Sequence, residues 1–371
     1  MPIIIEHSAK IEATLPERDV NKKMEVFYNP LMSSNRNISV ILLNSVENKK
    51  MGIALPLAGS GIRALRFLQE LKKGKIERLS VNDKKENFVK TFQDNLKLNK
   101  ISKTNSSKVT IKNEDAEKFM LTQHADEFCG YFDYIDIDPF GTPNPFLSFA
   151  VAKIKRNGIL AITATDTAAL TGTYPKVTKR KYWSTSLKNY MMHEIGLRIL
   201  IRKVQLQGIQ FDKALIPILS YHKGHYFRIY FRSEKGKQKC DDLIKNHQYL
   251  LFCPKCLNFK LSNYNSGDCE CKNEFQFAGP LWAGNLFDKK LVNKMAKNNH
   301  FPEEQKFLNT LKEEASCDIV GYYDLHAIAK AYKRDIPKMD LTLKKIKAVR
   351  THFSPNGIKT EASVCEIIKL L

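Results

Sequence analysis

The chain has 371 residues, of which 43% are hydrophobic and 10% aromatic, so it is not a disordered chain and has room for two or three domains. Lysine and arginine number 60 against 39 aspartates and glutamates, which gives a net charge of +21. This excess suggests a polyanionic partner, although a lysine-rich solvated surface would also produce it. Because nothing resembles a signal peptide and no apolar run reaches about 18 residues, we expect a cytoplasmic protein without a membrane span.

Strands and helices alternate through the first half of the chain. A turn and a helix are predicted in residues 26–46, after a polar entry segment at 11–23. Strands are then expected at 50–62, 76–83, 108–116, 132–138 and 157–166. Helices are expected at 63–74, 84–99, 117–125, 145–156 and 186–207. This alternation predicts a mostly parallel sheet with helices on both faces.

Two strands at 213–221 and 225–232 close this region. Only His222, Lys223 and Gly224 join them, and so short a link makes an antiparallel hairpin rather than a parallel crossover. Parallel strands closed by a hairpin are typical of the class I S-adenosylmethionine-dependent methyltransferase fold, which is Rossmann-like. We therefore expect residues 1–234 to form a domain of that class.

Residues 235–371 differ in kind and are predicted to be a second, α+β domain. Segments 322–334 and 339–349 read as two helices in a helix-turn-helix relation. Segment 350–362 then resembles a hairpin wing, although a plain α+β appendage is an equal alternative.

Small and acidic residues follow three successive strands. "LAGSGIR" places Gly59 and Gly61 in a tight turn before a helix, where free N–H groups suit an anion. Asp83 ends the second strand, where an acid can hold ribose hydroxyls, and Asp115 follows the third, where it can accept from an adenine amino group. Each acid alone could merely cap a helix. Together they predict a nucleoside site along the carboxyl edge of the sheet.

The fourth strand ends on Asp138-Pro139-Phe140, in "YIDIDPFGTPNPF". An exocyclic amine on a base is a poor nucleophile, and the Asp138 carboxylate or the Pro139 carbonyl can bind its hydrogens, while the carboxylate can also take up the released proton. Phe140 can stack on the base. An Asp-Pro helix cap is the structural alternative. The residues therefore favour a methyltransferase acting on a base amine.

Several long motifs resemble the tRNA guanine-26 N2,N2-dimethyltransferase family, at a length like that of its archaeal members. They are "EVFYNPLMSSNRNISV", "LAGSGIRALR", "DIDPFGTPNPF", "ATDTAALTGTYPKVTKRKYW", "GPLWAGNL" and "RTHFSPNGIKTEA". The resemblance implies transfer of two methyl groups from S-adenosyl-L-methionine to the 2-amino group of a guanosine in tRNA, with Asp138 as acceptor. It also implies cofactor contacts at Arg36, Arg63, Asp83, Asp115 and Ala116.

Four cysteines are grouped in the second domain, in a module spanning residues 253–271. Cys253 and Cys256 form one pair, and Cys269 and Cys271 the other. Four thiolates from two short knuckles suit a structural zinc ion, although free thiols are the alternative because the second spacing is tight. The remaining cysteines are expected to be ordinary buried residues: Cys129, Cys240, Cys317 and Cys365.

A basic run follows the fifth strand and holds Lys176, Lys179, Arg180 and Lys181 among aromatic residues. It is predicted to contact tRNA phosphates, although such a run is often just a solvated face. No obligate protein partner is evident. The alternatives to the tRNA reaction are methylation of an amine in ribosomal RNA or DNA, and a non-catalytic RNA-binding protein.

Overall fold

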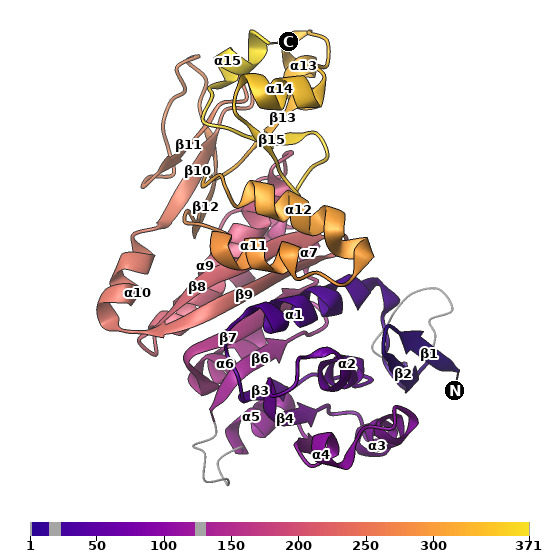
Figure 1. The fold of residues 1–371 in the computed structure, drawn as a ribbon. Coiled ribbons are helices and arrows are strands. Elements are labelled where there is room, and N and C mark those ends of the chain that lie inside the picture. The colour runs from indigo at the N-terminus through magenta and orange to yellow at the C-terminus, as the bar shows by residue number, and fades with distance from the viewer. Residues whose placement is uncertain (1, 15–23, 123–130, 371) are drawn as a thin grey trace. The chain divides into compact units, whose positions relative to one another are not determined.

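The structure is a computed structural model that describes residues 2–14, 24–122 and 131–370. The chain forms two compact units that do not follow chain order. The first unit comprises residues 1–164, 230–233 and 297–304, and the second comprises residues 165–229, 234–296 and 305–371. The ribbon in Figure 1 labels the helices and strands of both units.

The main sheet has seven strands in the order β5-β4-β3-β6-β7-β9-β8. Strands β3 to β7 pair in parallel. They are β3 Met51–Leu55, β4 Ile76–Asn82, β5 Val109–Lys112, β6 Phe132–Ile137 and β7 Ile154–Ala164. Every residue of β3 is buried, as expected where helices cover both faces of a parallel sheet. The predicted parallel sheet is therefore present.

The strand order reverses beside β3. The chain runs from β3 outward to β4 and β5, and then returns to place β6 on the other side of β3. Ligands of open α/β sheets bind outside the carboxyl ends of the strands at such a reversal. The loops after β3 and β6 occupy this position in the first unit.

Helices follow the parallel strands β3 to β6, as predicted, but with shifted ends. They are α1 Ser33–Ser45, α2 Ile62–Glu70, α3 Phe88–Leu98, α4 Lys103–Ser106, α5 Ala116–Thr122 and α6 Leu147–Lys153, with 3-10 turns at Pro30–Met32, Asn144–Phe146 and Pro302–Glu304. The helix expected to reach Arg156 ends at Lys153, because β7 already begins at Ile154. The last part of the helix expected at 117–125 lies outside the described residues.

The N-terminal segment forms a hairpin that the sequence did not predict. Strand β1, Ile3–Glu6, pairs antiparallel with β2, Ala9–Glu12. The backbone of this hairpin is bound by α3, where the Asn95 side chain accepts from the Glu12 N–H at 2.8 Å. Most of the polar entry segment expected at 11–23 lies outside the described residues.

The closing hairpin is present at the other side of the sheet. Strands β8, Lys213–Lys223, and β9, Tyr226–Lys235, are adjacent and joined by two residues. The sheet is thus mixed, as predicted for a class I methyltransferase. The helices before it are α7 Thr167–Leu170, α8 Pro175–Tyr182 and α9 Met192–Ile209. Helix α9 was expected to begin at Ser186, but Ser186 donates instead to the Leu170 carbonyl at 2.7 Å.

Two small sheets complete the second unit. Strands β10 His247–Phe252, β11 Phe259–Ser262 and β12 Gln276–Trp282 form one, and β13 Tyr323–Asp324, β14 Val349–Arg350 and β15 Gly357–Lys359 form the other. Its remaining helices are α10 Lys237–Ile244, α11 Lys289–Lys297, α12 Gln305–Glu314, α13 Leu325–Tyr332, α14 Met339–Lys345 and α15 Val364–Ile368. The antiparallel pair β14–β15 follows α13 and α14, and β15 also pairs with β13, so both expectations for 350–362, a hairpin wing and a plain α+β appendage, stay open. No helix within the described ranges is long and apolar enough to cross a membrane.

Candidate active site

Asp138 follows β6 and is bound by Arg63, the second residue of α2. The Arg63 Nη2 atom lies 2.5 Å from Asp138 Oδ2, and the carboxylate side chain is about one fifth exposed. Among the described residues, Asp138 Oδ1 has no hydrogen-bond partner. One oxygen is therefore fixed by the protein and the other is open to a ligand.

Arg63 is itself held by neighbours on α1 and β6. Its Nη1 donates to Ser39 Oγ at 2.8 Å and lies 3.4 Å from Asp136 Oδ2. Its Nη2 also donates to Asn35 Oδ1 at 2.9 Å. A guanidinium with this many bonds has one orientation, so Asp138 has one as well. The sequence analysis assigned Arg63 to the cofactor, and its pairing with Asp138 was not foreseen.

Phe140 is partly exposed and contacts an aromatic ring that the sequence analysis did not single out. The Phe27 ring meets it edge-on, with centroids 4.5 Å apart. A Cβ atom added to Gly59 would lie 3.1 Å from Phe27 Cδ1. Phe27 therefore links the glycine loop to the Asp138-Pro139-Phe140 segment. It lies within the quoted "EVFYNPLMSSNRNISV" motif, which was the available signal.

The glycine loop after β3 needs its glycines. Gly61 has a φ of 77°, and a Cβ atom there would lie 2.2 Å from the Phe92 ring. The Gly59 N–H donates to Asp83 Oδ2 at 2.8 Å, so the loop and the end of β4 are joined directly. Burial raises the pKa of Asp83, and the N–H groups of Gly59 and Lys85 oppose that shift only in part. These residues converge as predicted.

A buried hydroxyl in the same loop lacks a partner. Ser60 is 2% exposed, and its Oγ has no hydrogen bond among the described residues. Such groups are rare in native proteins, and here the group lies in the predicted cofactor loop. Asp115 is exposed before α5 and accepts from the Glu117 N–H at 3.0 Å, while Ala116, the first residue of α5, is buried. The loop, Asp83 and Asp115 thus follow β3, β4 and β5 in order.

Arg36 belongs to a buried ionic cluster in the first unit, which joins α1, α2 and β1. Its Nε donates to Glu6 at 2.7 Å, and Glu6 also accepts from Arg66 at 2.8 Å and from Tyr28 at 2.9 Å. Burial alone would raise the pKa of Glu6, but the bonds and charges of Arg36 and Arg66 lower it to about 2. No described residue accepts from Arg36 Nη1, which leaves a donor for a ligand.

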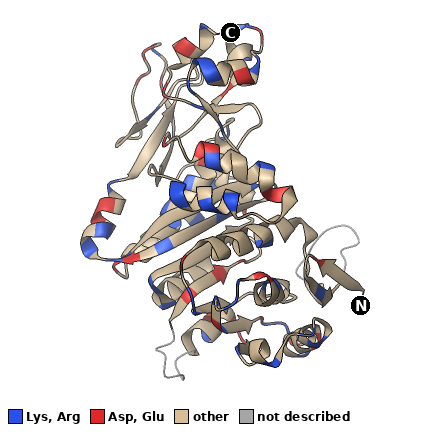
Figure 2. Ribbon diagram, viewed as in Figure 1, with Lys and Arg blue, Asp and Glu red and all other residues tan. Residues whose placement is uncertain are grey.

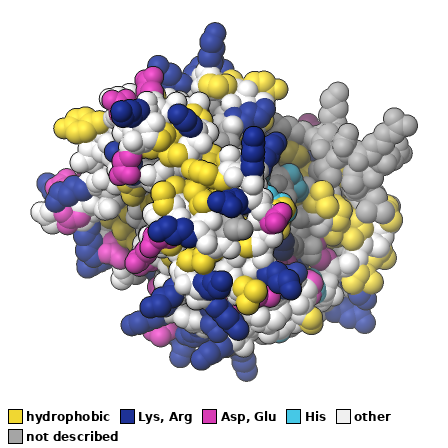
Figure 3. Space-filling model, turned by 90° about the horizontal axis from the view of Figure 1, so that it is seen from above, with side chains coloured by type: hydrophobic (Ala, Val, Ile, Leu, Met, Phe, Trp, Pro, Cys, Tyr) yellow, Lys and Arg dark blue, Asp and Glu magenta, His cyan; other side chains and the backbone are white. Residues whose placement is uncertain are grey.

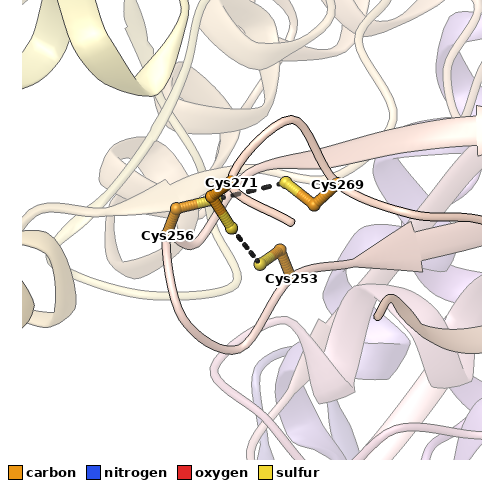
Figure 4. Close-up of side chains that lie close together, drawn as sticks. All are labelled: Cys253, Cys256, Cys269 and Cys271. Atoms are coloured by element: carbon orange, nitrogen blue, oxygen red, sulfur yellow. Dashed lines mark hydrogen bonds between the residues drawn. The ribbon is translucent and has the colours of Figure 1, made fainter. Parts of the chain in front are cut away.

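The four predicted cysteines of the module come together between β10 and β12, and their side chains point toward one another (Figure 4). The Cys253 and Cys271 sulfurs are 3.5 Å apart, those of Cys256 and Cys269 are 3.4 Å apart, and all four lie within 4.8 Å of one another. Tetrahedral zinc with sulfur ligands at about 2.3 Å requires sulfurs at about this separation.

The other cysteines differ in how far they are buried. Cys240 is buried as expected and Cys317 is half-buried. Cys365 is exposed, so its prediction as a buried residue was wrong: it lies in the short helix α15, which faces solvent there. Cys129 lies outside the described residues.

The predicted basic run forms helix α8. Lys176, Lys179 and Arg180 are exposed, whereas the Lys181 Nζ lies 2.9 Å from Asp166 Oδ2. Lysines also line α11, and the view in Figure 3 shows many more basic than acidic side chains at its surface (Figures 2 and 3). The charge excess therefore includes an exposed helix without a single acidic residue.

Comparison with known proteins agrees with this geometry. Residues 4–371 match the family described as N2,N2-dimethylguanosine tRNA methyltransferase. A tRNA (guanine(26)-N(2)/guanine(27)-N(2))-dimethyltransferase of Aquifex aeolicus is 37% identical, over 100% of this chain and 95% of its own length. A tRNA (guanine(26)-N(2))-dimethyltransferase of Methanobrevibacter smithii is 38% identical, over 96% and 94%.

A solved structure is also similar along the whole chain. Trm1 from Pyrococcus horikoshii, in complex with S-adenosyl-L-methionine, has a TM-score of 0.86 and 33% identity, and the match covers 100% of this chain and 99% of that one. This chain belongs to the N2,N2-dimethylguanosine tRNA methyltransferase family.

Proposed function

We propose that this protein transfers two methyl groups from S-adenosyl-L-methionine to the 2-amino group of guanosine 26 in tRNA. The family and its curated relatives support the reaction and the substrate. The observation in the structure that supports it best is Asp138, which has one oxygen fixed by Arg63 and the other open, beside the glycine loop.

The chemistry of the target explains the role of this carboxylate. The lone pair of the guanine amino nitrogen is delocalised into the ring, so the nitrogen attacks poorly. Asp138 Oδ1 accepts one amino hydrogen and the Pro139 carbonyl accepts the other, which draws the nitrogen toward tetrahedral geometry. As the amine becomes cationic, Asp138 takes up its proton. Arg63 keeps the carboxylate in position throughout.

The cofactor supplies the methyl group as an electrophile on sulfur. We assign its ribose hydroxyls to Asp83, its adenine to Asp115 and Ala116, and its amino-acid end to the loop of Gly59 and Gly61. The Ser60 hydroxyl, which has no partner within the part of the chain that the structure describes, and the Arg36 Nη1 donor suit the carboxylate of that end. Asp83→Asn should weaken cofactor binding strongly in calorimetry, whereas Asp138→Asn should leave it nearly unchanged.

A transfer assay across guanosine positions tests the reaction itself. Labelled cofactor is incubated with a tRNA transcript that has guanosine at 26, and with one that has adenosine there. Product in the first alone supports the proposal, and label in ribosomal RNA or DNA instead would overturn it. Since the Aquifex aeolicus relative is named for positions 26 and 27, a transcript with guanosine at 27 alone belongs in the same assay.

We propose that helix α8 contacts tRNA phosphates through Lys176, Lys179 and Arg180. Exposed cations on a helix without acids suit a polyanion. Lys181 pairs with Asp166 and would have to exchange that partner. Removing one contacting cation should reduce the slope of log affinity against log salt by about one.

We propose that Cys253, Cys256, Cys269 and Cys271 bind a structural zinc ion. The module around them has a small core, and the metal would supply folding energy that the packing does not. Metal analysis of protein purified without chelator should find about one zinc per chain. A metal-free protein that melts at the same temperature would contradict the assignment.

We also propose residues 1–234 as the methyltransferase domain and residues 235–371 as a tRNA-binding domain with the cysteine module. The loops after β3 and β6, which carry Gly59, Gly61 and Asp138, support the methyltransferase assignment. The antiparallel pair β14–β15 and the basic helix α11 support the tRNA-binding assignment. Cytoplasm remains the predicted location.

A further inference from the structure

Trp183 combines exposure with an unfavourable backbone conformation. It ends α8 with φ 54° and ψ 41°, and its side chain is 51% exposed. Helices commonly end in this left-handed conformation, but usually with glycine, because other residues pay a steric cost there. Trp183 has the largest side chain among the described non-glycine residues with positive φ. Backbone strain of this kind often marks a functional site.

The tryptophan ring is held from one side by a buried lysine of α9. The Lys203 Nζ atom lies 3.0 Å from the ring centroid, and Lys203 is only 5% exposed. Burial and the neighbouring Arg202 charge lower the pKa of Lys203 to about 8, so it is still a cation at neutral pH. Arg202 Nη1 also donates to the Trp183 carbonyl at 3.2 Å. A large aromatic surface is thus fixed in place while half of the side chain stays in solvent.

We propose that Trp183 is a stacking platform for an unpaired nucleobase of the tRNA substrate. Lys179 and Arg180 precede it on α8 and are exposed, so cations for the backbone adjoin an aromatic surface for a base. This is the combination by which proteins bind single-stranded nucleic acid. Paired bases within an RNA helix present no open face, so the partner is a base in a loop or bulge, or one flipped out. Lys203 contacts the Trp183 ring, and the half of the residue that remains in solvent is the surface that a base could cover.

The inference rests on tRNA being the substrate and on α8 facing it. Charge favours RNA over a protein partner here, because α8 has four basic residues and no acidic one. The tests below separate a failure of stacking from a failure of the reaction, since methyl transfer is measured on the same protein.

Tryptophan fluorescence provides a direct test. The chain has two tryptophans, and the other, Trp282, is 6% exposed. In Trp282→Phe, emission from Trp183 should be quenched when tRNA is added, and much less by heparin, a polyanion without bases. If Trp282→Phe does not fold, the difference between wild type and Trp183→Phe gives the same signal. Equal quenching by heparin and tRNA, or none by tRNA that is nevertheless methylated, would overturn the proposal.

Substitutions at Trp183 separate stacking from a structural role. Trp183→Phe should keep most of the affinity for tRNA, whereas Trp183→Gly should weaken it by about 5- to 150-fold, the effect of losing one stacked base. Glycine suits the left-handed backbone, so Trp183→Gly should melt near the wild-type temperature. Its salt slope should be unchanged, unlike that of Lys179→Ala, which should be flatter by about one. Unchanged affinity in Trp183→Gly would refute the platform.

Discussion

Two acids in ion pairs, one in each unit, show how similar pairs serve different purposes. Asp138 in the first unit is paired with Arg63 through one oxygen and remains about one fifth exposed. Glu194 in α9 of the second unit is fully enclosed and accepts from Lys359 through both oxygens, at 2.9 and 2.8 Å. It also accepts from Arg198 at 2.9 Å.

The difference lies in how many of the acid's lone pairs the protein uses. Glu194 receives further support from the Gly321 N–H, and the Lys359 ammonium donates onward to the Ile319 and Gly321 carbonyls. Both oxygens of Glu194 therefore accept hydrogen bonds from described residues. Asp138 keeps an oxygen that no described residue binds. A buried ion pair therefore indicates chemistry only when one partner stays incompletely satisfied.

The largest effect should come from removing the incompletely satisfied acid. Asp138→Ala should lower methyl transfer by about 10²- to 10⁴-fold, because it removes both the amine acceptor and the proton acceptor. The melting temperature should change little, since the side chain is partly exposed. Asp133→Ala, which removes a partly exposed acid paired with Lys155, is the control and should retain activity. Near-normal turnover by Asp138→Ala would show that the open oxygen of Asp138 has no role in methyl transfer.

Glu194, whose two oxygens are both occupied, should matter for stability and not for methyl transfer. Glu194→Gln should reduce the free energy of unfolding by about 3–5 kcal/mol, because Arg198 would lose its carboxylate partner in the interior and Lys359 would keep only Glu314, at 3.9 Å. Denaturant unfolding measures this. Methyl transfer per folded molecule should be nearly unchanged. Glu313→Gln, on the exposed face of α12, should cost less than about 0.5 kcal/mol.

Acid should weaken the two buried clusters in the same pH range. Burial alone would raise the pKa of Glu194, but Lys359 and Arg198 lower it to about 2, and the pKa of Glu6 is also about 2. Since both folded values lie below the ordinary 4.5, the stability they add is present above pH 4.5 and is lost as pH falls toward 2. In Glu194→Gln the free energy of unfolding should depend less on pH in this range. A wild-type stability independent of pH between 5 and 2 would contradict the ion pairs.

The smallest effect concerns the open space beside Asp138. After one transfer the amine has one hydrogen, and its new methyl group needs room. Gly141 has a φ of 80°, and a Cβ atom there would meet no atom within 4 Å. Gly141→Ala should therefore fold, at a cost of about 1–2 kcal/mol for the left-handed backbone, but accumulate monomethylguanosine. Mass spectrometry of digested tRNA gives the ratio, and an unchanged ratio would leave Gly141 as a turn residue only.

The sequence predicted the features that depend on local patterns. Strand lengths, the glycine turn and the acids at strand ends located the edge formed by Gly59, Asp83 and Asp138, because parallel strands bring their carboxyl ends to one side. Cysteine spacing located the sulfur cluster for a similar reason, since each pair belongs to one turn.

The pairings between distant segments could not be predicted. Glu6 lies 30 residues from Arg36 and Glu194 lies 165 from Lys359, and nothing local distinguishes these residues from surface charges. Lone charged residues in an alternating pattern are usually solvated. The family resemblance implied a cofactor contact for Arg63, and its pairing with Asp138, 75 residues away, is likewise invisible to local patterns.

The N-terminal hairpin has a consequence for how the gene is expressed. Translation that initiated at the internal Met24 would yield a chain that retains every residue assigned to the reaction but lacks Glu6. Arg36, which is 5% exposed, would then have no carboxylate partner among the described residues, and Arg66, at 0%, would keep only Glu70. Such a shortened product should be insoluble or rapidly degraded, so a recombinant clone with a misassigned start codon would fail without any change to its active site.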